Sequence, residues 1–180
     1  MLEEINHVKA SAEVLCDQQQ IEAALDRMAN EINELLADKN PLVLCVLNGG
    51  IVAAGQLLTR LTISLTLDAI HASRYQNKTV GETLDWLLKP SSSLKDKTIL
   101  IIDDILDEGI TLAAIHDYCL EQGASAVYIA VLVNKILGRD KPIQANFVGL
   151  HVENRYVFGY GMDYKGYLRN AAGIYAVANT

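Results

Sequence analysis

The stretch from Ile99 to Thr111, ILIIDDILDEGIT, constrains the fold of this chain more than any other. Residues 98–102 are continuously apolar and mostly β-branched, which is typical of a central strand covered on both faces. Asp103 and Asp104 end this predicted strand, and a glycine-containing loop leads into a helix predicted from about 110 to 122. The segment therefore predicts an α/β protein with a mostly parallel central sheet flanked by helices.

The rest of the chain alternates helices and strands in the same way. Apolar residues recur at helical spacing from Ile21 to Leu36, and Asp17 with Gln20 forms a capping-box pattern before them. A second helix is predicted at 51–61. We expect residues 1–180 to form one domain, without linker or repeat. Strands are predicted at 42–47, 64–73, 81–90, 127–133, 147–152, 156–160 and 174–177.

Composition excludes several classes of protein. Of the 180 residues, 51% are hydrophobic and 21% charged, as in globular proteins, and the apolar runs are too short to cross a bilayer. The first ten residues contain acids and no signal-peptide core, so we expect a cytoplasmic protein without a membrane partner. A net charge of −7 disfavours nucleic acid as a partner, and three widely spaced cysteines predict neither disulfides nor zinc.

The end of the 98–102 strand offers groups that could bind a sugar phosphate. Open α/β sheets bind ligands at the carboxyl ends of their strands. Backbone amides of the 107–111 loop could hold a phosphate, with the Thr111 hydroxyl as an extra donor, while Asp103 and Asp104 could accept hydrogen bonds from two ribose hydroxyls. The alternative is that Asp107 merely caps the following helix and the other two acids are solvated.

The same segment resembles the phosphoribosyl pyrophosphate (PRPP) motif of type I phosphoribosyltransferases, in which two acids and two apolar residues precede Asp-Thr-Gly-x-Thr. The resemblance implies the fold of that family, in which the N- and C-terminal segments form a small hood beside the central sheet and one loop is mobile. It also implies that Asp103 and Asp104 hold the ribose diol, that the loop after them binds the 5-phosphate and that Asp107 is the catalytic base, which exchanges a proton with purine N7. The loop residues concerned are Asp107, Glu108, Gly109, Ile110 and Thr111.

Glu108 departs from this motif, because the family has Thr or Ser at that position. A negative charge then stands beside the predicted phosphate site, and a hydroxyl donor is missing. We therefore expect the Glu108 side chain to face away from the phosphate and the backbone amides to do more of the binding.

Residues 47–50, LNGG, resemble the first loop of the hypoxanthine-guanine branch of this family. That loop binds pyrophosphate through main-chain amides and often contains a cis peptide bond. The resemblance assigns Asn48 and Gly49 to pyrophosphate, with Asn48 where the family has Lys. Whether Asn48-Gly49 is cis stays open, and an ordinary glycine turn is the alternative.

Residues 156–169 resemble the purine-binding signature of that branch. The resemblance implies that Tyr156 stacks on the base, that Val157 offers main-chain groups to it, that Asp163 lies near metal and base, and that Arg169 lies near pyrophosphate. The alternative is a core tyrosine and a surface Asp163–Arg169 pair.

Two further positions follow from the same resemblance. Lys135, which comes after the predicted 127–133 strand, would donate to purine O6 and favour 6-oxopurines; otherwise it is a solvated strand cap. Ser73, Arg74 and Tyr75 resemble the start of the family's mobile loop, with Arg74 inserted, and an exposed hairpin is the alternative.

Taken together, these resemblances imply purine salvage: PRPP and hypoxanthine or guanine would give IMP or GMP and pyrophosphate. They imply Mg²⁺ near Asp103, Asp104 and Asp163, with few protein ligands because Mg²⁺ keeps several waters. A homodimer or homotetramer is expected from the family, and no histidine is assigned to catalysis. The alternatives are a PRPP- or nucleotide-sensing regulator on the same fold and a phosphoacceptor receiver domain. The receiver domain would explain neither the 107–111 loop nor the C-terminal signature.

Overall fold

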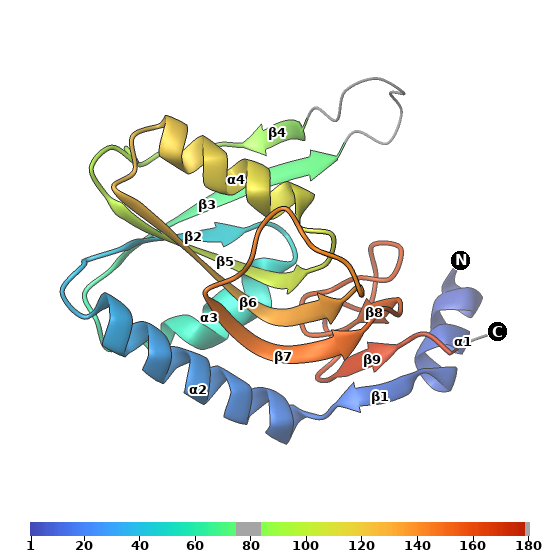
Figure 1. Ribbon diagram of the computed structural model, residues 1–180. Helices are drawn as coiled ribbons and strands as arrows, with labels where there is room; N and C mark the ends of the chain where they lie inside the picture. The colour runs from blue at the N-terminus through green and yellow to red at the C-terminus, as the bar shows by residue number, and fades with distance from the viewer. Residues whose placement is uncertain (75–83, 179–180) are drawn as a thin grey trace.

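The structure is a computed structural model that describes residues 1–74 and 84–178 (Figure 1). Its helices and strands alternate along the chain, as the hydrophobic pattern predicts. In chain order they are α1 (Leu2–Ser11), β1 (Glu13–Cys16), α2 (Gln18–Leu36), β2 (Leu42–Val46), α3 (Gly50–Leu58), β3 (Thr66–Arg74), β4 (Leu84–Leu88), β5 (Thr98–Leu106), α4 (Ile110–Glu121), β6 (Ala126–Ile136), β7 (Phe147–Glu153), β8 (Val157–Phe158) and β9 (Ile174–Ala176).

A six-stranded sheet in the order β4-β3-β2-β5-β6-β7 forms the centre of the molecule. Strands β3, β2, β5, β6 and β7 are parallel to their neighbours, and β4 joins the edge antiparallel to β3. Helix α4 connects the parallel neighbours β5 and β6, which makes the predicted βαβ unit. The prediction of an α/β fold with a mostly parallel sheet is confirmed.

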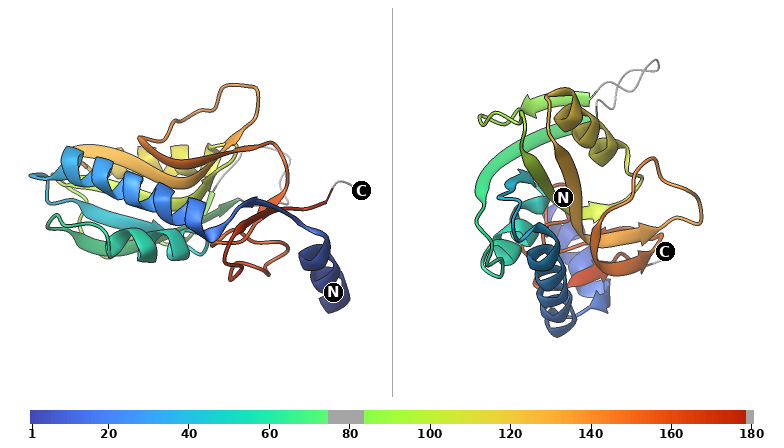
Figure 2. Two further views of the ribbon diagram at one scale, coloured as in Figure 1. Left: turned by 90° about the horizontal axis from the view of Figure 1, so that it is seen from below. Right: turned by 60° about the vertical axis from the view of Figure 1, so that its left-hand side comes forward.

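Helices cover both faces of this sheet, with α2 and α3 on one side and α4 on the other (Figures 1 and 2). In β5, Leu100 and Ile102 pack in the α2–α3 core, whereas Ile99 and Ile101 pack in the α4 core. All four side chains have no exposed surface. Burial on both faces explains why this strand is continuously apolar rather than alternating.

The capping box predicted for α2 is present. The Asp17 carboxylate accepts from the backbone N–H of Gln20 at 2.9 Å, and the Gln20 side chain accepts from the backbone N–H of Asp17 at 3.0 Å. These two bonds satisfy donors that an isolated helix end leaves unpaired. Behind them, the apolar face of α2 is buried from Ile21 to Leu36.

Two strand ends were predicted too early. Strand β5 continues through both acids to Leu106, and β6 continues beyond Val133 to Ile136, so Lys135 lies within a strand. The β5–β6 ladder pairs Asp103 with Val131 and Leu106 with Asn134. Backbone hydrogen bonds hold the ladder together, so it continues where the side chains turn polar.

A second, three-stranded sheet joins the N- and C-terminal segments, which the family resemblance assigns to a small hood. Its order is β1-β9-β8, with β9 antiparallel to both neighbours. Helix α1 and strand β1 were missed because α1 buries only Ile5 and Val8 and β1 has four residues. The arrowheads of β5, β6 and β7 point toward this small sheet (Figure 1). Within residues 1–74 and 84–178, no helix combines the length and apolarity needed to span a membrane.

The capping box gives a first prediction. Asp17→Ala removes the side-chain acceptor for the Gln20 amide, so the free energy of unfolding should fall by about 1 kcal/mol in urea titrations. Asp38→Ala, which removes an exposed carboxylate just after the same helix, is the matched control and should cause no comparable loss. Equal losses in both variants would mean that the box adds nothing to stability.

Candidate active site

A cavity of about 520 Å³ lies where the parallel strands end against the C-terminal segment. It collects the ribose-, pyrophosphate- and purine-binding residues predicted from the sequence. Asn48 and Gly49 come from the β2–α3 turn, Asp103 to Thr111 from the end of β5 and its loop, Lys135 from β6, and Tyr156, Val157, Asp163 and Arg169 from the C-terminal segment. Residues from four separate parts of the sequence therefore form one wall.

Asp103 and Asp104 are both buried, with 9% and 7% of their surface exposed. Asp103 Oδ1 accepts a hydrogen bond from the Asp104 backbone N–H at 2.9 Å. Burial raises the pKa of both carboxyl groups, and the negative charge of Asp104 raises the pKa of Asp103 further. Two acids held in this state are suited to binding hydroxyl or cationic groups that replace the lost water.

The Asp104 carboxylate packs directly on the backbone of Gly49. A Cβ at position 49 would overlap this carboxylate, and a Cβ at Gly161 would overlap the Gly49 carbonyl oxygen. Gly161 also has a φ of 108°, which L side chains rarely adopt. The β2–α3 turn, the end of β5 and the C-terminal segment therefore meet at a distance that only glycine permits.

The cis peptide bond in the first loop lies one residue earlier than the bond considered in the sequence. It joins Leu47 to Asn48, not Asn48 to Gly49. Gly49 has ordinary helical dihedral angles and precedes the first residue of α3. Asn48 and Gly49 of this turn line the same cavity as the acids.

The loop after β5 ends at the amino terminus of α4. Gly109 adopts the left-handed conformation with φ 83°, immediately before the first helical residue, Ile110. Helix amino termini present unpaired N–H groups and a positive partial charge, so this loop is suited to bind an anion. The position of Thr111 in the first turn brings a hydroxyl to the same cavity wall.

Glu108 lies in this loop and contributes to the cavity wall. Its carboxylate accepts from the Arg139 guanidinium at 3.1 Å, on the loop that follows β6. The partial neutralisation by Arg139 reduces the repulsion that a bare glutamate would exert on an anion bound at the loop.

Lys135 of β6 and Asp107 of the loop after β5 form an ion pair in the cavity wall. Lys135 Nζ lies 2.6 Å from Asp107 Oδ2. The lysine is 8% exposed, so it is not the solvated strand cap that was the alternative. The site thus presents a charged donor and a charged acceptor side by side.

The C-terminal segment is fixed by its own polar contacts. Arg169 forms an ion pair with Asp163 at 2.7 Å and donates to the Gly161 carbonyl at 2.7 Å, while Asp163 also accepts from the Gly166 amide at 2.7 Å. Both side chains are about one-third exposed. Asp163 and Arg169 do form a pair, and that pair faces the cavity.

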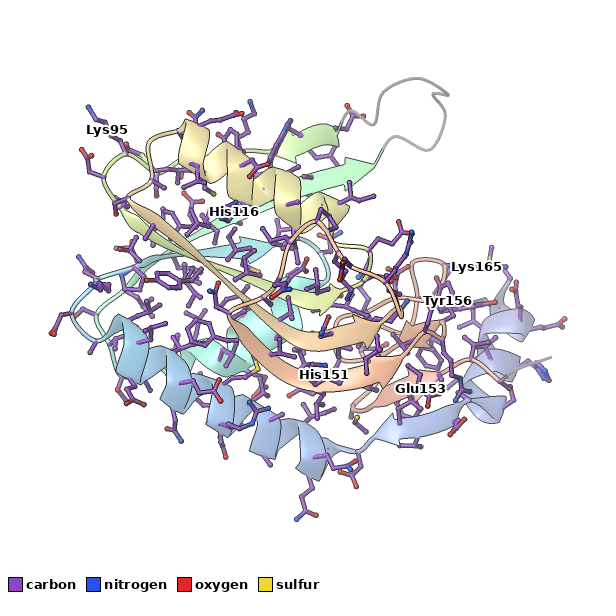
Figure 3. The ribbon with its side chains drawn as sticks, in the orientation of Figure 1. Lys95, His116, His151, Glu153, Tyr156 and Lys165 are labelled. Carbon is purple, nitrogen blue, oxygen red and sulfur yellow. The ribbon has the colours of Figure 1, made fainter. Side chains whose placement is uncertain are left out.

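Tyr156 is 53% exposed and is therefore not a core aromatic. Its ring packs edge-on against Tyr164, with centroids 5.4 Å apart. The Tyr164 hydroxyl donates to Glu4 of α1 at 3.0 Å, and Lys165 pairs with the same carboxylate at 2.5 Å. Tyr156 and Lys165 accordingly lie at the α1 end of the molecule (Figure 3).

The carboxylates fit a weakly held hard cation rather than a closed metal centre. Among the residues that the structure describes, no three His, Cys, Asp or Glu side chains form a group that could hold a metal ion. Asp103, Asp104 and Asp163 are thus not a joint three-ligand site. Oxygen donors spread along one cavity are compatible with Mg²⁺, which takes most of its ligands from water and phosphate.

Part of the mobile-loop prediction falls outside the described residues, and one titratable residue of the cavity wall was missed. Tyr75 lies outside the described residues. Ser73 and Arg74 end strand β3, and their role at the start of a mobile loop stays a prediction. His71, which was assigned no role, lines the cavity. Its place near the carboxyl end of a parallel strand beside β2 could have indicated this.

Comparison with known proteins places these features in one family. The family model of the phosphoribosyl transferase domain matches residues 11–165. The hypoxanthine-guanine phosphoribosyltransferase of Bacillus subtilis is 32% identical over 158 residues, which are 87% of this chain and 88% of that protein. The bifunctional protein TilS/HprT of Listeria innocua is 33% identical over 158 residues, and the match spans only 24% of its length.

The fold is also shared with solved structures. A hypoxanthine phosphoribosyltransferase from Trypanosoma cruzi in complex with the product IMP has a TM-score of 0.85 and 27% identity, covering 93% of this chain and 95% of that chain. The central sheet with helices on both faces is therefore the fold of type I phosphoribosyltransferases.

The buried acids predict a stability that depends on pH. The pKa of Asp103 is raised above its ordinary value of 3.8, so the contribution of this carboxyl to the free energy of unfolding falls as pH rises above that value. Asp103→Asn should therefore be more stable than the unchanged protein at about pH 7 in urea titrations with EDTA, and the difference should vanish at about pH 3.5, below the ordinary pKa of the carboxyl. Asp38→Asn, an exposed control, should show no such gain. An Asp103→Asn variant that is less stable at neutral pH would contradict the argument.

Proposed function

Because the chain belongs to the phosphoribosyl transferase domain family, we propose that it transfers the phosphoribosyl group of PRPP to hypoxanthine or guanine. The products are IMP or GMP and pyrophosphate, and the process is purine salvage. The relatives that carry this activity in their names support the proposal, as does the gathering of the predicted residues in one cavity.

The observation that carries the proposal is the ion pair of Lys135 and Asp107. A 6-oxopurine presents an acceptor, O6, beside N7, which carries a proton in one tautomer of the free base. The Lys135 ammonium donates to O6 while the Asp107 carboxylate accepts from N7–H, so the 2.6 Å spacing of the pair suits that edge of the base. A 6-aminopurine would turn an N–H group toward the ammonium, which disfavours it.

PRPP binds with its three parts on three elements. Asp103 and Asp104 accept from the ribose hydroxyls, which replace the water that burial removes from these carboxylates. The 107–111 loop and the start of α4 hold the 5-phosphate through backbone N–H groups. Asn48, Gly49 and Arg169 line the same cavity and are the proposed pyrophosphate ligands, with Arg169 as the cationic partner.

During the reaction, purine N9 forms a bond to the anomeric carbon as the bond from that carbon to the pyrophosphate oxygen breaks. Asp107 takes the N7 proton, so the base becomes neutral after the attack. Tyr156 stacks on the purine ring, and Val157 offers main-chain groups to its edge. Positive charge develops on the ribose, and the two buried aspartates beside it stabilise that charge.

Mg²⁺ fits this site as a partner of the substrate more than of the protein. Asp103, Asp104 and Asp163 supply carboxylate oxygens without forming a closed centre among the described residues. When bound, Mg²⁺ neutralises the pyrophosphate and makes it a better leaving group. Arg169, already ion-paired with Asp163, adds a second cation at the same end of the cavity.

The proposal is tested by incubating the protein with PRPP, Mg²⁺ and one purine base at a time. We expect nucleotide and pyrophosphate in equal amounts from hypoxanthine or guanine, and neither product from adenine. PRPP binding in calorimetry without pyrophosphate release for any base would instead identify a PRPP-sensing regulator. Lack of both binding and turnover would refute a phosphoribosyl site.

Self-association and location are further predictions from the family. We expect a homodimer or homotetramer, measurable by light scattering at several protein concentrations, and a cytoplasmic location. Exposed leucines on β3 and β4 give support to self-association, since large apolar side chains at a sheet edge favour contact with another surface: Leu67 is 54% exposed, Leu87 61% and Leu88 44%.

The purine-edge argument predicts a selective loss in Lys135→Gln. Removing the charged donor should lower kcat/KM for hypoxanthine by about 10- to 150-fold, since a hydrogen bond from a charged group contributes roughly 1.5 to 3 kcal/mol. The KM for PRPP should stay within twofold. Lys95→Gln, an exposed lysine at the opposite end of the molecule from Tyr156, is the control (Figure 3). A loss of PRPP affinity alone would remove Lys135 from the purine site.

Asp107→Asn should keep binding but lower turnover. An amide cannot accept the N7 proton, so kcat should fall about 100-fold or more while the KM for PRPP changes little. Asp140→Asn, an exposed acid on the loop after β6, should have normal kcat. Near-normal turnover of the Asp107→Asn variant in steady-state assays would leave Asp107 with a structural role only.

A further inference from the structure

Lys141 lies outside the cavity wall, on the loop that follows β6, and its ammonium contacts three oxygens. Nζ donates to the Leu106 carbonyl at 2.7 Å, to Asn134 Oδ1 at 2.7 Å and to the Lys135 carbonyl at 2.6 Å. An ammonium has three donor hydrogens and no acceptor, so these oxygens use its full capacity. The distances are those of charge-assisted hydrogen bonds.

These contacts lie at the point where β5 leaves the sheet. Leu106, the last residue of β5, is paired with Asn134, and β6 continues for two residues beyond that pair. No further β5 residue follows to donate to the carbonyls at the end of the ladder. The Lys141 ammonium donates instead to the Leu106 and Lys135 carbonyl oxygens at the end of the β5–β6 ladder.

The backbone that Lys141 holds is the backbone that carries the ion pair of the site. Leu106 directly precedes Asp107, and the Lys135 carbonyl belongs to the residue whose Nζ lies 2.6 Å from Asp107 Oδ2. Lys141 therefore fixes both sides of the pair through main-chain oxygens, without contacting the cavity. Loss of the Lys141 contacts would therefore change the distance between Lys135 Nζ and Asp107 Oδ2 without changing either side chain chemically.

The surroundings of Lys141 support a fixed rather than a mobile ammonium. It is half-buried; burial lowers its pKa, while the nearby charge of Asp107 acts in the opposite direction. Its partner Asn134 also contacts Nδ1 of His151 at 3.3 Å, which links these contacts to β7. His151 is labelled on that strand in Figure 3.

We propose that Lys141 is a positioning residue, which sets the spacing of Lys135 and Asp107 by joining the ends of β5 and β6. The role in base recognition rests on the proposed function, whereas the role as a strand clamp does not. The two parts are therefore measured separately.

The clamp is tested by hydrogen exchange of the ligand-free protein. Lys141→Met keeps most of the side-chain volume but removes the ammonium. Backbone amides of residues 105–112 and 134–138 should then exchange at least tenfold faster than in the unchanged protein, and amides of α2 should be unaffected. Lys95→Met, the exposed control, should change neither region. Unchanged exchange at both strand ends, or equal acceleration throughout the chain, would overturn the clamp.

The consequence for the site is tested by steady-state kinetics. In Lys141→Met, the fold-increase in the KM for hypoxanthine should be at least five times the fold-increase in the KM for PRPP. The reason is that PRPP is also held by Asp103 and Asp104, which lie within the β5–β6 ladder. Parallel changes in both constants, or no change, would overturn the positioning role even if the clamp is found. Failure of the unchanged protein to form nucleotide would refute the proposed function, and exchange would then decide the clamp by itself.

Restoring the ammonium gives the matching rescue. Lys141→Cys treated with 2-bromoethylamine regains a side chain of similar length that ends in an ammonium. The native cysteines, Cys16, Cys45 and Cys119, are all buried, which favours reaction at position 141. Treatment should return the KM for hypoxanthine to within threefold of the unchanged protein. A modified protein that stays as impaired as the Met variant would overturn the proposal.

Discussion

The structure depends on burying two carboxylates inside a β-ladder. Asp103 and Asp104 continue the pairing of β5 with β6, and both are less than 10% exposed. Their burial is possible because the β2–α3 turn and the C-terminal segment approach them without side chains, at Gly49 and Gly161. A side chain at either glycine would separate the segments that form the cavity, so this close approach fixes the relative positions of the proposed pyrophosphate, ribose and base sites.

The second constraint on the site is that the neighbouring strands β5 and β6 end at different levels of the sheet. Strand β5 turns away after Leu106 to reach the amino terminus of α4, whereas β6 runs on to Ile136. This offset brings Asp107 from a loop beside Lys135 from a strand, at 2.6 Å. Asp107 lies in a loop, which can adjust when a phosphate binds. Lys135 lies in β6, where the hydrogen bonds of the ladder hold its backbone in place. Lys141 limits that adjustment at the point where the two strands part.

Much of this could be predicted from the sequence, because apolar periodicity reports burial on each face. The capping box of α2, the central strand and the βαβ unit follow from local patterns. The ends of β5 and β6 did not, since hydrogen bonding between strands continues where side chains become polar, as at Asp103 and Lys135. The resemblance of residues 47–50 indicated a cis bond in this loop, but nothing in the residue types places it at Leu47-Asn48 rather than at Asn48-Gly49. The three contacts of Lys141 depend on how its loop packs against β5 and β6. The residue types within the loop do not predict that packing.

The charge of the site explains how an acidic chain can bind a polyanion. The net charge is −7, and the proposed ribose site has two acids of its own. Cations are nevertheless placed individually: Arg169 is bound to Asp163, Arg139 to Glu108 and Lys135 to Asp107. Each of these cations has a carboxylate partner in the ligand-free chain, so none of the three is left without compensation. In the proposed reaction, phosphate groups would replace these carboxylates as partners of the cations, and Asp103 and Asp104 would gain hydroxyl donors. Burial raises the pKa of Asp103 and Asp104 in the ligand-free chain, so a ligand that donates hydroxyl groups to these two carboxylates would offset part of their desolvation.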